Sequence, residues 1–275
     1  MGRVVLIEAA AASEPAAPAP IELRPIRFRL QLVHVRSLAV AAAITMLVSM
    51  SFLLAPDVHT IEAPLGSTQA VAFELPDGTA GYLSAGSALT FSDTFADGVR
   101  NVALKGEASF DVAKTGARFI VHTRDSEVSV LGTEFAVRSW PGDIEPETVV
   151  SVLEGRVAVQ KRYGSDHPVE LTDLQQLRVR DGIDISAESL SATTEQTFSW
   201  ISGGAEFVNM PIGNVLSELS RRHNVILDAP PPIRDRRITL LPQPGASIED
   251  VLVDMSAAVN VRYRKIAGGF EFYLD

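Results

Sequence analysis

The sequence predicts a mainly β protein with a small α+β module at its C-terminus and one apolar helix near its N-terminus. Between about residues 68 and 179, apolar and polar residues alternate, and Gly, Asp and Pro separate the runs at intervals of roughly 8 to 12 residues. Beyond Trp200 the apolar spacing becomes that of amphipathic helices. From Leu38 to Ala55 no residue is charged. These patterns divide the chain into an anchor, a β domain and a C-terminal module.

The uncharged run from Leu38 to Ala55 is long enough to cross a membrane. As a helix it rises about 27 Å, close to the roughly 30 Å of a hydrocarbon core. Four arginines lie between residues 24 and 36, before the run, and no Lys or Arg follows it until Arg100. Because cytoplasmic flanks carry the excess of basic residues, we expect the N-terminus in the cytoplasm.

We therefore expect a single-pass inner-membrane protein. Residues 1–36 form a short, disordered cytoplasmic tail, residues 37–56 form the transmembrane helix, and residues 57–275 are periplasmic. A cleaved signal peptide is the alternative, but its apolar segment would be shorter and nearer the N-terminus. The uncleaved anchor is the preferred interpretation.

Composition argues against several classes of function. The chain has 24 Lys and Arg against 34 Asp and Glu, a net charge of −10, which argues against a nucleic-acid partner. It has no cysteine, so disulfides, thiolate metal sites and a cysteine nucleophile are excluded. The five histidines lack metal-ligand spacing, and the sequence has no phosphate-binding glycine loop or nucleophile elbow. We expect a protein without enzymatic activity, cofactor or metal.

Residues 67–183 are expected to form the β domain, after a linker over residues 57–66. The inward-facing pairs along it are Val102/Leu104, Phe110/Val112, Phe119/Val121, Val128/Val130, Phe135/Val137, Val150/Val152, Val157/Val159 and Leu177/Val179. No long helical pattern interrupts them. The region is therefore sandwich-like, a barrel or a β-solenoid, and the alternation does not choose among the three.

Residues 204–275 are expected to form a small α+β module of repeated βαβ units, after a polar linker over residues 184–203. Two sets of residues have the spacing of a buried helical face: Ile212, Val215, Leu216 and Leu219, and Ile248, Val251, Leu252 and Met255. Short apolar strands flank both helices, at 205–208, 225–228, 238–241, 261–265 and 270–274. This order predicts two helices packed on a small sheet.

Five stretches resemble the successive motifs of FecR-type sensor proteins. They are LPDG at 75–78, LKGEASFDVA at 104–113, VLGTEFAV at 130–137, VLEGRV at 152–157 and WISGGAEF at 200–207. Residues 204–275 are similar to the short N-terminal (STN) module shared by secretins and TonB-dependent receptors. The two resemblances together cover most of residues 66–275.

The resemblance implies a transmembrane regulator of an extracytoplasmic-function sigma factor. In such systems a TonB-dependent outer-membrane transducer that has bound an iron chelate or another substrate presents its periplasmic signalling domain to the sensor. The sensor then controls release of the sigma factor. The alternative is a membrane-anchored periplasmic interaction or scaffold protein that does not bind a sigma factor directly.

The cytoplasmic tail departs from the FecR pattern. The family usually carries a helical sigma-binding domain before the span, and residues 1–36 lack an amphipathic helical pattern. The sensing half is therefore what the resemblance implies most directly. We therefore expect that the sigma factor is contacted in the cytoplasm by the tail itself or by another chain, or that the start of the gene is displaced.

Gly132-Thr133 is the dipeptide whose residue types could support a chemical reaction of the chain itself. In a strained turn the Thr133 hydroxyl can attack the carbonyl of Gly132 in an N-to-O acyl shift. The resemblance implies self-cleavage at a matching Gly-Thr in some FecR-like sensors. The alternative is a bend at Gly132 that Thr133 caps, and the residues by themselves favour this bend.

Three aromatic residues are the candidate partner contacts. Phe270 and Phe272 lie on a strand that we expect at the edge of the module sheet, where a strand of the partner can add. Trp200 is either a hinge plug between the β domain and the module or a partner hot spot. Two carboxylates, Glu107 and Asp111, are expected on a solvated strand face rather than in a paired-carboxylate site.

Overall fold

The computed structural model describes residues 40–46, 57–98, 100–162, 167–180, 187–189 and 198–274. The chain divides into two compact units, Met1–Ala55 and Pro56–Asp275. In the first unit residues 40–46 are helical. The rest of the predicted transmembrane helix 37–56 and the tail 1–36 lie outside the described residues. No helix in the described part of the chain is long and apolar enough to cross a membrane.

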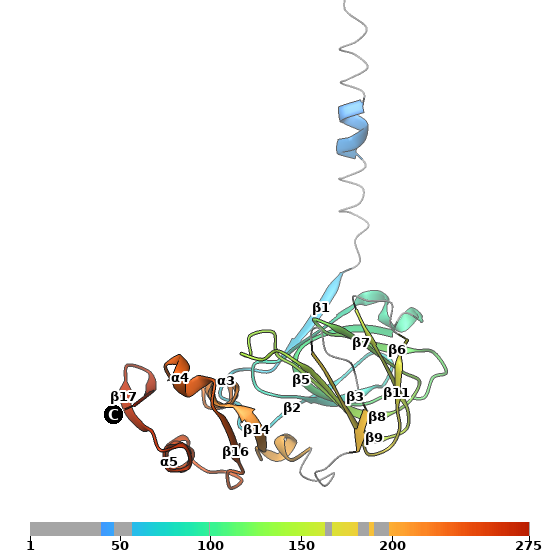
Figure 1. Cartoon of the computed structure of the whole chain (residues 1–275). Helices are drawn as coiled ribbons and strands as arrows, with labels where there is room; N and C mark the ends of the chain where they lie inside the picture. Colours follow the sequence, from blue (N-terminus) through green and yellow to red (C-terminus); the bar gives the residue numbers. More distant parts are fainter. Residues whose placement is uncertain are drawn as a thin grey trace, which may run out of the picture. The chain divides into compact units, whose positions relative to one another are not determined.

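A β domain forms the first part of the second unit (Figure 1). Its strands are β1 (Val58–Glu62), β2 (Val71–Glu74), β3 (Ala80–Leu83), β4 (Ala88–Ser92), β5 (Arg100–Asp111), β6 (Phe119–His122), β7 (Ser126–Val130), β8 (Glu134–Ser139), β9 (Thr148–Glu154), β10 (Val157–Lys161), β11 (Val169–Leu171), β12 (Gln175–Val179) and β13 (Ala187–Ser189), with a short 3-10 helix, η1 (Asp93–Asp97), after β4. They form one 13-stranded sheet. The prediction of a mainly β protein is confirmed.

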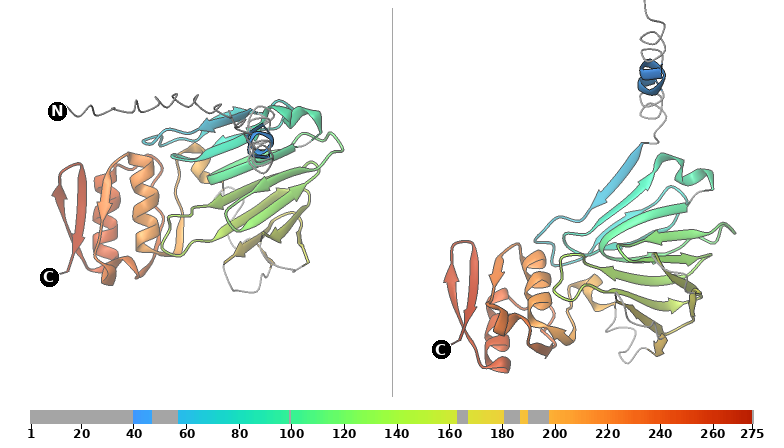
Figure 2. Two further views of the ribbon diagram at one scale, coloured as in Figure 1. Left: turned by 90° about the horizontal axis from the view of Figure 1, so that it is seen from above. Right: turned by 45° about the horizontal axis from the view of Figure 1, so that its top comes forward.

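Pairing in this sheet decides among the three architectures left open. Among the described strands, β5 and β6 pair in parallel and all other pairs of this sheet are antiparallel. A β-solenoid stacks successive coils in parallel. The solenoid interpretation is therefore wrong, and the sheet is nearly closed and barrel-like (Figure 2).

Strand β5 joins the two layers of the sheet. Its first half pairs with β4 and β6, and its second half pairs with β3 and β8. Between the halves Gly106 has a φ of 116°, and a Cβ there would lie 2.4 Å from the hydroxyl oxygen of Ser87. Glycine meets both constraints, so β5 bends and passes from one layer into the other. One layer runs β1-β4-β5-β6-β7-β10-β11 and the other β2-β3-β5-β8-β9-β12-β13.

The hydrophobic core lies between the two layers. All the predicted inward-facing residues are buried in it. Phenylalanines of both layers meet there: the ring of Phe110 stacks on Phe135 at 5.2 Å between centroids and lies 5.6 Å from Phe119. Residues 58–62, expected within a linker, form β1 and pair with β4. Their side chains are mostly exposed, so the apolar alternation that marks the other strands is weak here.

The C-terminal module begins with a 3-10 turn and contains two long helices. Its elements are η2 (Ser199–Ser202), β14 (Phe207–Pro211), α3 (Ile212–His223), β15 (Ile226–Asp228), α4 (Pro231–Arg234), β16 (Arg237–Leu240), α5 (Ile248–Val259), β17 (Arg262–Ile266) and β18 (Gly269–Tyr273). Helices α3 and α5 coincide with the two helical patterns of the sequence, and their apolar faces meet in a second core. The single turn α4 begins at two prolines, whose fixed φ suits the first positions of a helix.

The strands of the module form two small sheets. One has the order β14-β16 and the other β15-β18-β17. Strand β18 lies in the middle of its sheet, parallel to β15 and antiparallel to β17. The prediction that Phe270 to Leu274 is an edge strand is therefore wrong. The position of a strand within a sheet depends on distant partners, which its own sequence does not contain.

Candidate functional site

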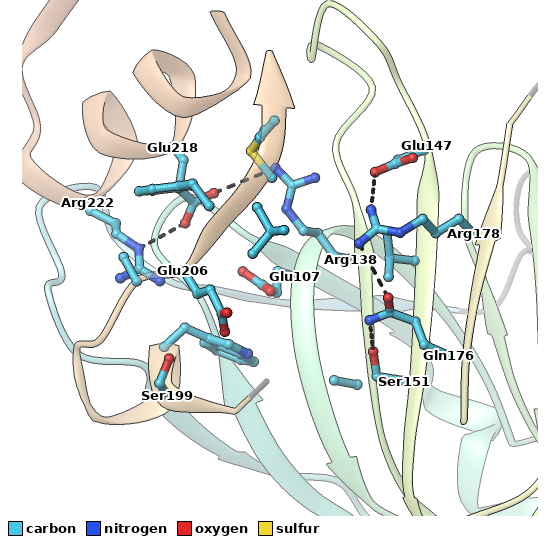
Figure 3. Close-up of a pocket in the computed structure, with 17 residues that line it drawn as sticks. Glu107, Arg138, Glu147, Ser151, Gln176, Arg178, Ser199, Glu206, Glu218 and Arg222 are labelled. Carbon is cyan, nitrogen blue, oxygen red and sulfur yellow. Dashed lines mark hydrogen bonds and ion pairs between the residues drawn. The ribbon is translucent and has the colours of Figure 1, made fainter. Parts of the chain in front are cut away.

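A cavity of about 440 Å³ lies between the β domain and the module (Figure 3). Its floor is the outer face of β8, β9 and β12. Residues paired across these strands form two rows on this face: Arg138, Val149 and Arg178 in one row, and Ala136, Ser151 and Gln176 in the other. They alternate along the strands with core residues such as Val150 and Leu177. The period of two that buries one set therefore turns the other set toward the cavity.

The opposite wall of the cavity belongs to the module. Residues 205–208 line it in succession. Because successive side chains of an extended chain point to opposite faces, the edge of this segment, which leads into β14 at Phe207, borders the cavity. Trp200 of η2 also lines it and is only 6% exposed. A backbone hydrogen bond of 3.3 Å from the N–H of Ala70 to the carbonyl of Ile201 ties η2 to the β domain.

Glu218 is the centre of an ion-pair network between α3 and the β domain. Its Oε1 accepts from Nε of Arg222 at 2.9 Å, and its Oε2 accepts from Nη2 of Arg221 at 2.8 Å. Nη2 of Arg138, on β8, lies 3.9 Å from the same Oε2. Burial alone would raise the pKa of Glu218, but the three arginines lower this pKa to about 2. Glu218 is therefore ionised at neutral pH.

Arg221 reaches from α3 to two segments of the β domain. Its guanidinium carbon lies 3.7 Å from the centre of the Trp140 ring, a cation–π contact, and its Nη1 lies 3.9 Å from the buried carboxylate of Asp143. Arg138 also binds Asp143, at 2.9 Å. The backbone carbonyl of Arg221 accepts from the N–H of Gly66 at 2.8 Å. One residue of the helix thus contacts both the loop after β8 and the segment after β1.

The loop between β8 and β9 also docks on the first turn of α3. The backbone N–H of Ile144 donates to Oδ1 of Asn214 at 2.7 Å. A Cβ on Gly213 would lie 2.0 Å from Cδ1 of Ile144, so glycine permits this close approach. Glu145 of the same loop pairs with Arg237 at the start of β16. The junction between the β domain and the module is therefore held by Trp140, Asp143, Ile144 and Glu145 of this loop.

Glu107 brings an unpaired carboxylate to the cavity. It lies opposite Arg138 in the β5–β8 register, and its side chain points into the cavity (Figure 3). Within the described part of the chain, its carboxylate accepts no hydrogen bond and makes no ion pair. Burial and the nearby Glu218 raise the pKa of Glu107 to about 7, although Arg138, Arg222 and Arg221 act in the opposite direction.

The expectation of a solvated strand face holds for Asp111 and is wrong for Glu107. Asp111 is exposed at the end of β5, whereas Glu107 is half-buried under the module. The two side chains share the period of one strand, but the module covers only part of that strand. Cover by a distant segment is not visible in a local pattern.

Gly132 and Thr133 form the bend before β8. The hydroxyl of the buried Thr133 donates to the carbonyl of Arg156 at 2.8 Å. The φ of Gly132 is not positive, and a Cβ on it would lie 2.3 Å from Cγ of Lys114, so packing requires glycine here. This geometry matches the bend interpretation, in which the hydroxyl stabilises a turn. Self-cleavage at this bond stays a prediction.

The three aromatic residues predicted as partner contacts are all buried. Phe270 is 8% exposed and Phe272 is 1% exposed, and both belong to the core of the module. They cannot contact a partner while the module is folded, so this prediction is wrong. Trp200 is buried between the β domain and the module and lines the cavity. This position is the one expected of a residue that fills the hinge between the two parts.

The junction network itself was not predicted from the sequence. On α3 a signal was present: Glu218 and the arginines at 221 and 222 have the i, i+3 and i+4 spacing of helical ion pairs. On the β domain Arg138 and Asp143 lie five positions apart at a strand end and give no such pattern. Their contact with α3 depends on a docking geometry that only the folded chain shows.

Comparison with known proteins gives a consistent result. Residues 61–158 match the family model FecR, described as FecR protein. A crystal structure of a candidate anti-sigma factor from Parabacteroides distasonis ATCC 8503 at 2.50 Å resolution is similar with a TM-score of 0.70 and 29% sequence identity, covering 80% of this chain and 100% of that chain. A second crystal structure of a candidate anti-sigma factor from the same organism, at 1.65 Å, gives a TM-score of 0.69 and 29% identity over 79% of this chain and 99% of that chain. A search of the curated proteins gave no match. Over residues 61–158 the chain is therefore similar to FecR proteins.

Proposed function

We propose that this protein regulates a sigma factor from the inner membrane, with residues 37–56 as its anchor and residues 57–275 in the periplasm. The similarity of residues 61–158 to FecR proteins carries the proposal, and the similarity to a candidate anti-sigma factor supports it. The uncharged run from Leu38 to Ala55, with arginines before it, supports the membrane anchor and its orientation. The net charge of −10 agrees with a partner that is not a nucleic acid.

The proposed external partner is the signalling domain of a TonB-dependent outer-membrane transducer. Strand β18 has neighbours on both sides, whereas β17 has one neighbour among the described strands. On β17 the side chains of Arg264 and Lys265 are exposed on opposite faces of the strand, and Arg264 pairs with Glu271 of β18. A strand with acidic side chains could add to the free edge of β17 through backbone hydrogen bonds. We therefore propose β17, and not β18, as the receiving strand.

The proposed signal passes through the junction toward the anchor. Arg221 of α3 accepts a hydrogen bond from Gly66, four residues after the end of β1. Strand β1 begins at Val58, next to the proposed anchor. A partner that shifts the module would therefore act on the segment that leads to the membrane.

The test compares transcription in cells that lack the gene with cells that carry defined variants. We expect Lys265→Glu to weaken binding to an acidic signalling domain and to uncouple one set of sigma-dependent genes from its inducer. Lys105→Glu, an exposed charge reversal on β5, is the matched control and should leave both unchanged. If cells that lack the gene show no transcriptional change while the purified wild-type chain binds the signalling domain, the result would support the scaffold alternative instead.

The anchor is tested separately. A reporter that is active only outside the cytoplasm, fused after Asp275, should be active, and the full-length chain should fractionate with the inner membrane. A soluble periplasmic species that begins near Pro56 in unstimulated cells would show a cleaved signal peptide.

A further inference from the structure

We propose that the junction cavity binds a compact organic cation, an ammonium or guanidinium group, between the carboxylates of Glu107 and Glu206. The two residues come from different parts of the chain, Glu107 from β5 and Glu206 from the segment before β14, and both point into the cavity (Figure 3). Within the described residues, neither carboxylate makes a hydrogen bond or an ion pair. This binding site does not depend on the sigma-factor role.

The other acidic groups of the cavity already have basic partners. Glu147 pairs with Arg178 at 2.8 Å and with Arg180 at 2.7 Å. Glu218 has its own arginines on α3, as described above. Glu107 and Glu206 are therefore the carboxylates of this cavity that make no ion pair with a described side chain, whereas Arg138, Arg178 and Arg222, which also line it, are already paired with other carboxylates.

Because Glu107 is half-buried, an unpaired negative charge on its carboxylate is energetically unfavourable. A carboxylate that is buried without a cationic partner tends to take up a proton. The pKa of Glu107, about 7, agrees with this behaviour. The groups that act on it are Glu218, Arg221 and Arg222 of α3 and Arg138 of β8, and their effects do not offset its burial. A bound cation would replace the proton and restore the charge.

The remaining walls suit an organic cation better than a metal ion. Trp200, Phe207 and Met210 line the cavity, and an aromatic ring beside a carboxylate is a common way to hold an ammonium or guanidinium group. The volume of about 440 Å³ lies in the range of small-molecule sites. No group of three His, Asp or Glu in the described residues could hold a metal ion.

The test measures binding of methylguanidine to the purified full-length chain by isothermal titration calorimetry and by tryptophan fluorescence. N-methylurea, which has a similar shape and no charge, is the neutral control probe. We expect Glu107→Gln and Glu206→Gln each to weaken methylguanidine binding by roughly tenfold or more, because each removes one charged contact without a change in volume. Glu170→Gln, at an exposed position on β11, is the matched control and should bind as the wild type does.

A second arm uses pH. Because a bound cation requires the ionised form of Glu107, affinity should fall about tenfold between pH 8 and pH 6, and this dependence should vanish in Glu107→Gln. Equal binding of N-methylurea, or wild-type affinity in both cavity variants with folding verified by circular dichroism, would overturn the proposal. The peptide Gly-Arg-Gly distinguishes a partner's side chain from a free small molecule: tighter binding than methylguanidine indicates the former, and weaker binding the latter.

Discussion

The guanidinium carbon of Arg221 lies 3.7 Å from the centre of the Trp140 ring, so a side chain of α3 rests on the loop that follows β8. The same arginine pairs with Glu218 and faces the buried Asp143. It is therefore the residue whose removal should loosen the module most.

Arg221→Ala should weaken the docking of the module on the β domain. The change removes the cation–π contact and leaves Asp143 and Glu218 with fewer partners, at a cost of about 2 to 4 kcal/mol. Thermal unfolding should then show two transitions or a broadened one. Arg236→Ala, an exposed arginine of the same module, should melt as the wild type does. A single unchanged transition in Arg221→Ala would show that the junction holds without it.

Stability should fall as pH rises toward 7 because of Glu107. The unfolded carboxyl ionises near its ordinary pKa of 4.5, whereas the folded carboxyl keeps its proton up to a pKa of about 7. In this window the folded state binds more protons, so the free energy of unfolding decreases as pH rises and levels off above it. The total change is up to about 3 kcal/mol.

Urea unfolding at several pH values measures this effect. Glu107→Gln should reduce the slope between about pH 5 and pH 7, to which Glu134 and Asp143 also contribute because burial raises the pKa of each, and should be more stable than the wild type at pH 8. Glu218 does not contribute in this window, because its pKa of about 2 leaves it ionised. An identical slope in Glu107→Gln would assign the titration to another group.

Gly106→Ala should destabilise the β domain by several kcal/mol. The new Cβ would meet the side chain of Ser87, and its backbone would have to keep a φ of 116° that alanine disfavours. Gly142→Ala is the matched control, since a Cβ there meets nothing within 4 Å. Equal unfolding midpoints for the two variants would mean that β5 can bend in another way.

Leu219→Asp should unfold the module. Leu219 is 2% exposed in the module core, and a carboxylate that replaces it among apolar side chains costs several kcal/mol. Val253→Asp, at a position on α5 that is 55% exposed, should be tolerated. Proteolysis followed by mass spectrometry should find residues 204–275 cleaved in the first variant and protected in the second.

Thr133→Ala tests both roles of the Gly132-Thr133 bend. Loss of the hydrogen bond to Arg156 should lower stability by about 1 kcal/mol. If the acyl shift operates, mass spectrometry of the wild-type chain will find a fragment that ends at Gly132, absent in Thr133→Ala and retained in Thr133→Ser. A wild-type chain that stays intact for days at neutral pH would leave the bend as the role of these residues.

Local periodicity predicted most elements of this fold and little of their assembly. The inward residues of the β domain and both helical faces were readable, because burial on one side imposes a period of two or 3.6. The choice of a barrel-like sheet over a solenoid depended on which strands pair, and the central place of β18 depended on β15 and β17. These are long-range relations that no single segment encodes.

The candidate site was hidden for a related reason. Its floor is made of the outward residues of β8, β9 and β12, which in isolation look like an ordinary solvated face. Glu107 becomes a buried carboxylate only because a module that begins about one hundred residues later covers it. Sequence reasoning found Trp200 at the junction because a lone tryptophan between two patterns is conspicuous, and it missed Arg221 because arginine on a helix usually faces water.

The central position of β18 constrains the order in which the module can be completed. During synthesis β15 and β17 leave the ribosome before residues 269–273, yet they have no direct pairing with each other and meet only through β18. A chain cut short before Gly269 would present two unfilled strand edges and would lack Phe270 and Phe272 from its core. Premature termination near the 3′ end of the gene should therefore yield a product that aggregates and is sensitive to proteases, rather than a slightly shorter functional protein.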